Sequence, residues 1–538
     1  MLELRRSHRP LIMGQSGAVA SNHPFATQAG LDALRAGGNA ADAAVAVAIT
    51  LGVAEPMMSG LGGDGFYNLW LAAEGRGRVY NGSGSAPAAA DPARYAGSGM
   101  PPDGAGAAST PGSLGALAAM HAAHGRLPWA SLFRTAIALA AEGLPVTQNY
   151  RRYAKMSLGR LRKDALATAT YLHEGDVPAV GHLIRQIALA RTLEEVAHGG
   201  YEAFYRGALA RRLAAATQGR GGIIAEADLA GFEAEMQAPV GITYRGYDIL
   251  QTPPNSMGFV LLQELKIVER FDLASLGHNS ADAIHIQVEA KKRAFRDRER
   301  YATDPRFAEV PLEHILSETH ADAMADDIDL HRASEVPLTL PAPNEGNTTY
   351  FCIVDAEGNA VSAIQSINNP FGSGVVAGET GILLNNRMTT WHLGSHPNAL
   401  KPGKRVRHTM NAPMILKDGK PWGVVGTPGA DNQVQVNLQA ITALIDFNLD
   451  PQAVVEAPRW FSSQPGQEAN WPHGGNDALT IEEDVGEATL ARLTAKGHHL
   501  QRQGHIEGTC SLECIRVLEN GVRAAGSDPR RDGWAGAY

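Results

Sequence analysis

A threonine opens an extended, apolar stretch of sequence at position 348, directly after a loop. Residues 337–346 read PLTLPAPNEG, and three prolines with a single charge are typical of an exposed linker. Residues 348–366 then read TTYFCIVD, AEGN and AVSAIQS. Their β-branched residues around a Gly-Asn turn predict a strand, a turn and a second strand. We therefore expect Thr348 to begin a strand beside an accessible peptide bond.

A threonine at a chain terminus can carry out covalent catalysis with its own two polar groups. Its hydroxyl attacks a carbonyl carbon, and its free α-amine acts as the base that takes the hydroxyl proton. Inside an intact chain Thr348 has no free amine, so the bond between Asn347 and Thr348 would have to break first. The residues alone leave a second interpretation open, because many threonines after a loop simply begin a strand.

Other patterns that could carry chemistry are weaker. The glycine-rich GLGGDG of residues 60–65 lacks the Lys-Ser/Thr ending of a phosphate-binding loop, which favours a structural turn. The three cysteines have no ligand spacing for zinc and are too few for a disulfide framework, so we expect buried free thiols at Cys352, Cys510 and Cys514. The histidines at 392, 396 and 408 are irregularly spaced. We expect no metal and no cofactor.

The composition limits the classes of binding partner that we expect. The net charge of −9 argues against a nucleic-acid partner. Residues 291–300, KKRAFRDRER, alternate bases with acids and predict a solvated helix face. The N-terminal 21 residues contain no apolar signal-peptide core, and no stretch is long and apolar enough to span a membrane. We therefore expect a cytoplasmic protein without a membrane partner.

Helix and strand patterns alternate along the chain and indicate an α/β protein. Residues 26–51 predict two helices separated by Gly37-Gly38, with Asn39 or Asp42 as the cap of the second. Further helices are predicted at 114–143, 188–217, 282–301, 432–446 and 451–457, and further strands at 66–72, 244–251, 381–384, 414–416 and 423–426. A length prior of about 150 residues per domain gives three or four domains. A large layered α/β fold would instead form one unit.

Blocks along nearly the whole chain resemble the gamma-glutamyltranspeptidases, a family of N-terminal-nucleophile hydrolases. The block NTTYFCIVDAEG at 347–358 is similar to the segment where these precursors cleave themselves. The other similar blocks are GGNAADAAVA (37–46), EPMMSGLGGDGF (55–66), TPG (110–112), HGRLPW (124–129), GGIIAEADLAGF (221–232), HIQVEAKKRAFRDRERYATDP (285–305), FGSGVVAGETGILLNN (371–386) and SDPRRDGWAGAY (527–538).

The resemblance implies a four-layer αββα sandwich with two central antiparallel sheets, in the α/β (α+β) class. It also implies autocatalytic cleavage between Asn347 and Thr348. Residues 1–347 would form the large chain and 348–538 the small chain. The two chains would remain together in one αββα domain as a heterodimer, and such heterodimers could pair further.

The same resemblance assigns roles to individual residues. Thr348 falls on the nucleophile, and Ser366 falls where the family has a second threonine whose hydroxyl orients it. Asn368 falls on an asparagine that contacts substrate. Gly429 and Ala430 fall on the Gly-Gly pair whose backbone N–H groups form the oxyanion hole, and alanine keeps that N–H. The implied reaction passes through a threonyl acyl-enzyme that water or an amine acceptor resolves.

The residues that would grip a γ-glutamyl head group depart from the family pattern. Ser83 stands where an arginine should hold the substrate α-carboxylate. The segment that should hold the α-amine begins with Asn385-Asn386, as in the family, but Arg387 adds a cation and Thr390 replaces an aspartate.

Two further departures lie downstream. His408-Thr409 replaces a Ser-Ser pair, and residues 391–404 are short for the lid loop. Arg387 and Arg407 could hold a carboxylate that is presented differently, whereas the arginine would repel a substrate ammonium. The other interpretation of Arg387 is a salt-bridged surface residue.

These departures resemble a gamma-glutamyltransferase-like side branch of the family. The leading hypothesis is an amide hydrolase or acyltransferase acting on γ-glutamyl or related acyl amides. An amidohydrolase for small acids of the oxamate type, or a cephalosporin-type acylase, is the alternative enzyme. An unprocessed homologue that only binds its ligand is the non-enzyme alternative.

Overall fold

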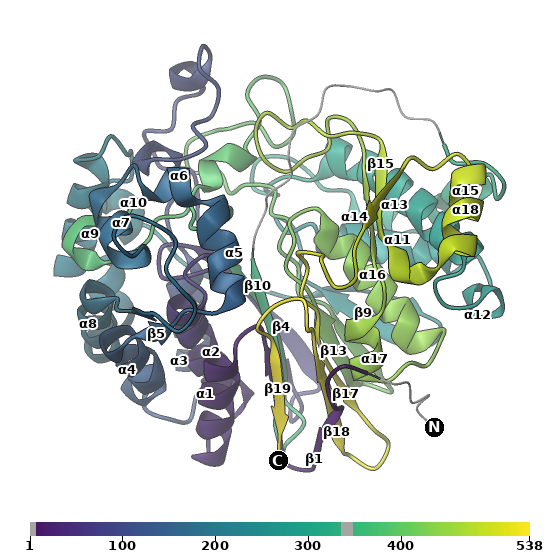
Figure 1. Ribbon diagram of the computed structural model, residues 1–538, viewed down its shortest axis with the longest axis horizontal. Helices are drawn as coiled ribbons and strands as arrows, with labels where there is room; N and C mark the ends of the chain where they lie inside the picture. The colour runs from purple at the N-terminus through teal and green to yellow at the C-terminus, as the bar shows by residue number, and fades with distance from the viewer. Residues whose placement is uncertain (1–6, 335–347) are drawn as a thin grey trace.

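The computed structural model describes residues 7–334 and 348–538, and its strands form two large sheets that pack face to face between helices (Figure 1). The sheet that contains the strand after Thr348, here the Thr348 sheet, has seven strands in the order β19-β2-β10-β11-β3-β4-β7. The second sheet also has seven, in the order β1-β18-β17-β13-β12-β9-β8. All neighbouring pairs within both sheets are antiparallel. The expected four-layer αββα sandwich is confirmed.

The bounds of the strands are as follows. The Thr348 sheet contains β2 (Ala18–Ser21), β3 (Asp64–Leu71), β4 (Arg76–Gly82), β7 (Glu235–Gln237), β10 (Thr349–Val354), β11 (Ala360–Ser366) and β19 (Trp534–Ala537). The second sheet contains β1 (Ile12–Gly14), β8 (Val240–Tyr244), β9 (Tyr247–Gln251), β12 (Met414–Lys417), β13 (Lys420–Gly426), β17 (Glu513–Val517) and β18 (Arg523–Ser527). Each sheet contains strands from both sides of position 348.

The hairpin predicted after Thr348 is present as β10 and β11, at the centre of the Thr348 sheet. Both faces of β10 are buried. Tyr350, Cys352 and Val354 point into the core between the two sheets. Phe351 and Ile353 point the other way, into the core beneath the helices. This period of two fixes the direction of every side chain near the start of the strand.

Helices of the first half of the chain cover the outer face of the Thr348 sheet (Figure 1). The predicted break at Gly37-Gly38 separates the first two, and Asn39 caps the second helix in a capping box with Asp42, as expected. These helices are α1 (Pro24–Arg35), α2 (Ala40–Ala54) and α3 (Ser113–His124), with α4 (Arg134–Glu142), α8 (Ile187–Tyr205) and α9 (Ala208–Gln218) farther out.

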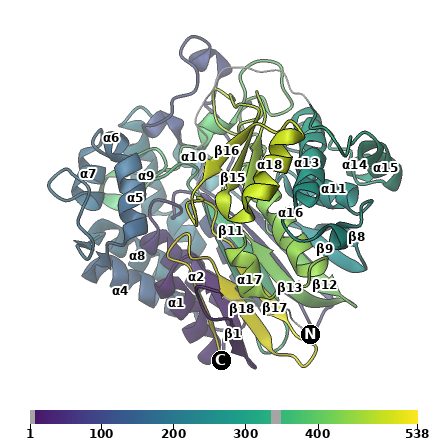
Figure 2. The ribbon, with the colours of Figure 1, turned by 45° about the vertical axis from the view of Figure 1, so that its right-hand side comes forward.

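The outer face of the second sheet is covered by helices that lie before residue 334 and after residue 348 in the chain. α11 (Gly258–Val268), α16 (Asn432–Ile445) and α17 (Pro451–Glu456) pack against its strands, and α13 (Ala281–Tyr301) packs against α11 and α16. A smaller sheet, β14 (Trp460–Ser463), β15 (Ala478–Glu482) and β16 (Leu500–Gln503), lies with α18 (Glu487–Ala495) beside α13 (Figure 2).

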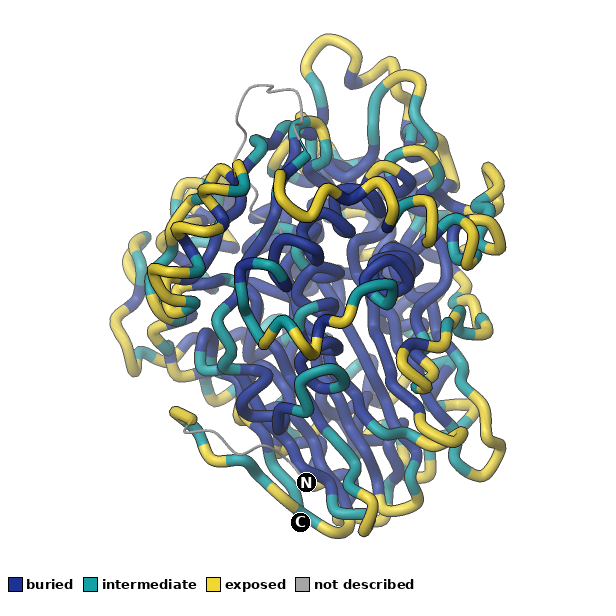
Figure 3. Tube along the Cα trace, turned by 90° about the vertical axis from the view of Figure 1, so that its right-hand side faces the viewer, coloured by how far each residue is buried: buried dark blue, intermediate teal, exposed yellow. Residues whose placement is uncertain are grey.

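The helix predicted over 282–301 is present as α13, but the solvated face predicted for residues 291–300 is wrong. Lys291, Arg293 and Arg298 are buried, because α13 lies between α11 on one side and the smaller sheet with α18 on the other. Figure 3 shows the general pattern, with buried segments inside the molecule and exposed segments around its outside. Their charges are paired inside the protein; Arg298, for example, binds Asp431 at 2.5 Å. The alternating basic and acidic residues of α13 therefore belong to a buried network of ion pairs and do not form a solvated surface.

Three smaller predictions can also be judged. The strand predicted at 381–384 is wrong, since only an isolated bridge pairs Val376 with Leu383 there. Cys352, Cys510 and Cys514 are buried free thiols, as expected. No helix in the described part of the chain is both long and apolar enough to cross a membrane. The linker at 337–346 and Asn347 lie outside the described residues.

Candidate active site

Thr348, Ser366 and Asp64 form one row across three neighbouring strands of the Thr348 sheet. Asp64 begins β3 and is paired with Ser366, the last residue of β11. On the other side of β11, Thr349 is paired with Gln365, so the same register brings Thr348 opposite Ser366. The Thr348 Oγ1 atom donates a hydrogen bond to the Ser366 Oγ atom at 3.3 Å. Residues paired across strands share a face, so the three side chains lie on the same side of the sheet.

This row lies at the end of the space between the two sheets. Two positions farther along β11 and β3, on the same face as the row, Ile364 and Phe66 belong to the core between the sheets, as Tyr350 does on β10. Thr349 points the opposite way, and its hydroxyl donates to Glu55 Oε2 at 2.6 Å. Of the two neighbouring threonines, only Thr348 therefore faces Ser366.

Asn368 connects the row to the segment that follows it. Its backbone N–H donates to Ser366 Oγ at 2.8 Å, so Ser366 contacts both Thr348 and Asn368. Its side-chain amide donates to Thr389 Oγ1 and to Asn470 Oδ1, each at 3.0 Å. Asn368, the asparagine expected to contact substrate, is thus linked to the Thr348 hydroxyl through Ser366. The N–H groups of its side-chain amide already donate to acceptors within the protein.

Arg387 is salt-bridged, as one interpretation held, but it is buried and not at the surface. Its Nε atom donates to Asp64 Oδ2 at 3.1 Å, and its Nη1 atom donates to Asn368 Oδ1 at 2.9 Å. Its Nη2 atom is buried and has no hydrogen-bond partner among the described residues. Asp64 supplies the Arg387 cation with a counter-charge that the sequence did not reveal.

His408 completes a group of three around the Asp64 carboxylate. The Asp64 Oδ1 atom accepts the backbone N–H of Gly84 at 2.8 Å, and His408 Nε2 lies 3.3 Å from Asp64 Oδ2. Burial opposes the Asp64 charge, but His408 and Arg387 outweigh it and hold the Asp64 pKa below its ordinary value. Burial and the Arg387 charge lower the pKa of His408 to about 4. At neutral pH Asp64 is therefore negatively charged, Arg387 is positively charged and the ring of His408 is neutral.

The remaining predicted binding residues are held by neighbours to different degrees. The Ser83 hydroxyl accepts from Asn255 at 2.9 Å, and the Thr390 hydroxyl donates to Asn470 at 3.2 Å. Asn386 supports the backbone, since its Oδ1 atom accepts the Asn369 N–H and its Nδ2 atom donates to a carbonyl. The hydroxyl of Thr409, in contrast, makes no recorded hydrogen bond within the described residues. Arg407 is buried against Glu299 at 2.8 Å.

The proposed oxyanion-hole residues lie in the turn between β13 and α16. The end of β13 is at the same end of the sandwich as Thr348, because Gly426 packs directly against the ring of Tyr350. Gly429 and Ala430 follow with φ angles of 132° and 48°. The turn is closed by hydrogen bonds from Asn432 N–H to Gly429 O and from Gln433 N–H to Ala430 O. This alanine thus adopts the left-handed conformation that a glycine would favour.

Comparison with known proteins decides the family. A family model described as Gamma-glutamyltranspeptidase matches residues 26–538. The chain belongs to the gamma-glutamyltranspeptidase family. It is accordingly a hydrolase of the N-terminal-nucleophile type, the class that the sequence blocks indicated.

Relatives within this family have several activities in their names. The chain is 36% identical to a glutathione hydrolase-like YwrD proenzyme of Bacillus subtilis, covering 97% of this chain and 99% of the relative. It is 35% identical to an oxamate amidohydrolase proenzyme of Klebsiella pneumoniae, covering 97% and 98%. Among solved structures, a cephalosporin acylase from Bacillus halodurans superimposes with a TM-score of 0.90 at 35% identity, covering 100% of this chain and 98% of that one.

The strained alanine of this family member gives a stability prediction. A non-glycine residue in the left-handed region costs about 1–2 kcal/mol, and glycine returns about 0.4–1 kcal/mol of that through the unfolded chain. Ala430→Gly should therefore raise the free energy of unfolding by roughly 0.5–1 kcal/mol, measured from the midpoint of urea unfolding. Ala440→Gly, inside α16, is the matched control and should lower it by about 1 kcal/mol. Equal losses in both variants would show that Ala430 is unstrained.

Three residues of the site were missed by the sequence analysis. Asp64 was interpreted only as part of a glycine turn, although a single acidic residue directly before an apolar strand could have indicated a site residue. Asn470 accepts hydrogen bonds from Asn368, Thr389 and Thr390, and nothing in its neighbourhood marked it. Arg531 donates from Nη1 to the carbonyl oxygen of Thr348 at 2.9 Å. It lies in the block SDPRRDGWAGAY, which carried resemblance but no assigned role.

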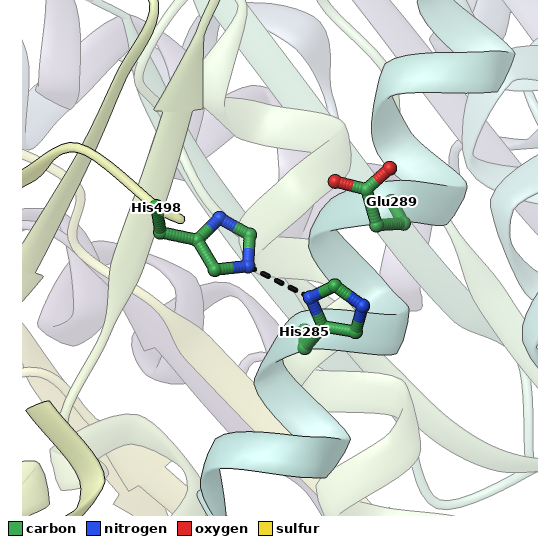
Figure 4. A group of neighbouring side chains, drawn as sticks. All are labelled: His285, Glu289 and His498. Atoms are coloured by element: carbon green, nitrogen blue, oxygen red, sulfur yellow. Dashed lines mark hydrogen bonds between the residues drawn. The ribbon is translucent and has the colours of Figure 1, made fainter. Parts of the chain in front are cut away.

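Two clusters in the described chain bring together side chains that could ligate a metal. In the first, His285 Nδ1 and His498 Nε2 are 2.8 Å apart and share a hydrogen bond (Figure 4). Its third member, Glu289, already binds Lys292 and Arg293, each at 2.9 Å. Two cations at the only carboxylate of the cluster oppose the binding of a third.

The second cluster consists of Glu299, His392 and His396. His396 Nδ1 accepts the backbone N–H of Asn398 at 2.9 Å, so the neutral ring carries its proton on Nε2, the atom nearest Glu299. Glu299 is also paired with Arg298 and Arg407. The tautomer and the paired charges favour a hydrogen-bonded network over a metal site.

We therefore predict that incubation with a chelator such as EDTA leaves amide hydrolysis unchanged. The nucleophile, base and oxyanion donors expected for this family are all protein groups. The rate of hydrolysis before and after chelation, with metal added back, measures this. Activity that is lost with EDTA and restored by one metal ion would contradict it.

Proposed function

We propose that Thr348 is the nucleophile of an acyl-amide hydrolase that forms when the chain cleaves itself between Asn347 and Thr348. The observation that carries this proposal is the hydrogen bond from Thr348 Oγ1 to Ser366 Oγ, at the end of the space between the two sheets. The hydroxyl is thereby oriented by a second hydroxyl, the role expected of Ser366. Arg531 fixes the carbonyl of the same residue from the other side.

In the proposed reaction the α-amine released at Thr348 takes the hydroxyl proton as Oγ1 attacks the amide carbonyl. The developing oxyanion accepts backbone N–H groups of Gly429 and Ala430, and the helix α16 that follows adds its positive end. The protonated amine then gives its proton to the leaving nitrogen, and a threonyl ester remains. Water or an amine acceptor attacks the ester by the same steps in reverse and releases the acyl group.

After cleavage the two chains, residues 1–347 and 348–538, would stay associated as a heterodimer. Strand β10 of the small chain lies between β2 of the large chain and its own partner β11, and β11 in turn pairs with β3 of the large chain. Separating the chains would expose the core between the sheets. The two would thus form a single αββα domain.

The substrates we propose are acyl amides that carry a carboxylate but no free α-amine. Near Asn368, the Nη2 of Arg387 is a hydrogen-bond donor with no acceptor among the described residues, and it is left over for substrate. Relatives named as an oxamate amidohydrolase and a cephalosporin acylase are consistent with such acyl groups. A relative from Escherichia coli that is 34% identical to this chain is named as a glutathione hydrolase. γ-Glutamyl amides are therefore the second candidate class of substrate.

A matched pair of anilides tests this choice. Glutaryl p-nitroanilide and γ-glutamyl p-nitroanilide differ only by the α-ammonium of the second. We expect a higher kcat/KM for the glutaryl compound, together with two bands on a denaturing gel. Faster turnover of the γ-glutamyl compound would reverse the assignment of substrate, and a single band with no turnover would favour an unprocessed binding protein.

A further inference from the structure

The guanidinium of Arg387 occupies a position whose acceptors suit an ammonium ion. It donates to Asp64 Oδ2 from Nε and to Asn368 Oδ1 from Nη1. A carboxylate oxygen and an amide oxygen at hydrogen-bond distance from one cation are a pair that a primary ammonium, with its three donors, could also satisfy. Both acceptors belong to residues in contact with Ser366, either through the strand register or through a hydrogen bond.

Arg387 is also the charged partner of Asp64 that could be removed. The other two contacts of that carboxylate are the backbone N–H of Gly84 and the ring of His408. The side chain of Asp64 is fully buried, so its charge depends on a partner inside the site. Without Arg387, an incoming cation would be the natural replacement.

We propose that Asp64 and Asn368 form an ammonium-binding subsite that Arg387 fills from within the chain, and that this occupation excludes substrates with a free α-amine. Asp64 is then a specificity-determining residue whose carboxylate is masked. Unmasking it should admit γ-glutamyl amides. This inference rests on the proposed function at Thr348, because the subsite only selects substrates that the nucleophile attacks.

The test is the ratio of kcat/KM for γ-glutamyl p-nitroanilide to that for glutaryl p-nitroanilide. Arg387→Ala, which leaves space and removes the charge, should raise this ratio about tenfold to a hundredfold, the effect of one charge-assisted hydrogen bond. Asp64→Asn in the Arg387→Ala background should lower the ratio about tenfold or more below that of Arg387→Ala, because both variants lack Arg387 and differ only in the carboxylate. Arg387→Lys, which places an ammonium of its own in the subsite, should not raise it.

Assays at about pH 7.5 keep the nearby imidazole out of the comparison. Burial is the larger cause of the low pKa of His408 and the Arg387 charge the smaller, so loss of Arg387 would raise that pKa only in part. At pH 7.5 the ring of His408 stays neutral and leaves the charge of Asp64 available to an incoming ammonium.

Each variant is normalised to its processed fraction, read from the two bands on a denaturing gel. If Arg387→Ala is not processed, Arg387→Gln replaces it, with a smaller gain in the same direction. A ratio that is the same within about twofold in processed Arg387→Ala and in the processed double variant overturns the masked subsite and leaves the proposed function intact. A wild-type enzyme that hydrolyses neither anilide overturns the proposed function instead.

Discussion

Thr348→Ala should remain a single chain, whereas the wild-type protein should separate into residues 1–347 and 348–538 on a denaturing gel. The substitution removes the hydroxyl that would attack the Asn347 carbonyl, so neither self-cleavage nor acyl transfer can begin. Amide hydrolysis should fall by on the order of a thousandfold or more. Mass spectrometry of the denatured proteins identifies the new N-terminus, and anilide turnover measures the activity.

Two controls separate the nucleophile from its surroundings. Thr348→Ser keeps a hydroxyl at the same position and should still be cleaved, although more slowly. Thr349→Ser alters the neighbouring threonine, which faces Glu55 on the other side of the sheet, and should be cleaved at a rate close to that of the wild type. Efficient cleavage of Thr348→Ala at the same bond would mean that another protease makes the cut.

The local elements of this site could be predicted from the sequence. The turn after β10, the cap at Asn39 and the strand that follows Thr348 were all predicted from neighbouring residues, and the structure contains each of them. Their causes are short-range: β-branched residues at a period of two, and an asparagine in front of a helix. The two-sheet architecture came from resemblance, because periodicity alone indicated only an α/β protein.

The electrostatics of the site could not be predicted, because they depend on residues far apart in the chain. Arg387 and Asp64 are separated by 323 positions, and no local pattern connects them. The charges of α13 show the same limit: Arg298 meets Asp431 only after the second sheet and its helices have assembled. The left-handed angle of Ala430 was open for a similar reason, since a β-carbon neither requires nor forbids it strictly.

Arg387→Gln should raise the KM for a carboxylate-bearing amide such as glutaryl p-nitroanilide about tenfold to a hundredfold. Loss of a hydrogen bond to a charged group costs roughly 1.5–3 kcal/mol, and the free Nη2 of Arg387 is the donor that we expect a substrate carboxylate to use. Asp64 and Asn368 take the Nε and Nη1 atoms, so Nη2 is the nitrogen of Arg387 that has no acceptor among the described residues.

A neutral substrate and a second arginine make the assignment specific. Pentanoyl p-nitroanilide lacks the carboxylate, so its KM should change little in Arg387→Gln. Arg407→Gln removes another buried arginine, which pairs with Glu299 and whose Nη2 also has no partner among residues 7–334 and 348–538. If Arg387 holds the substrate carboxylate, the large change in KM should occur only in Arg387→Gln and only for the glutaryl compound. A larger change in Arg407→Gln would place the carboxylate at Arg407, and equal changes for the charged and neutral anilides would mean that the Asp64–Arg387 pair supports the shape of the site without binding substrate.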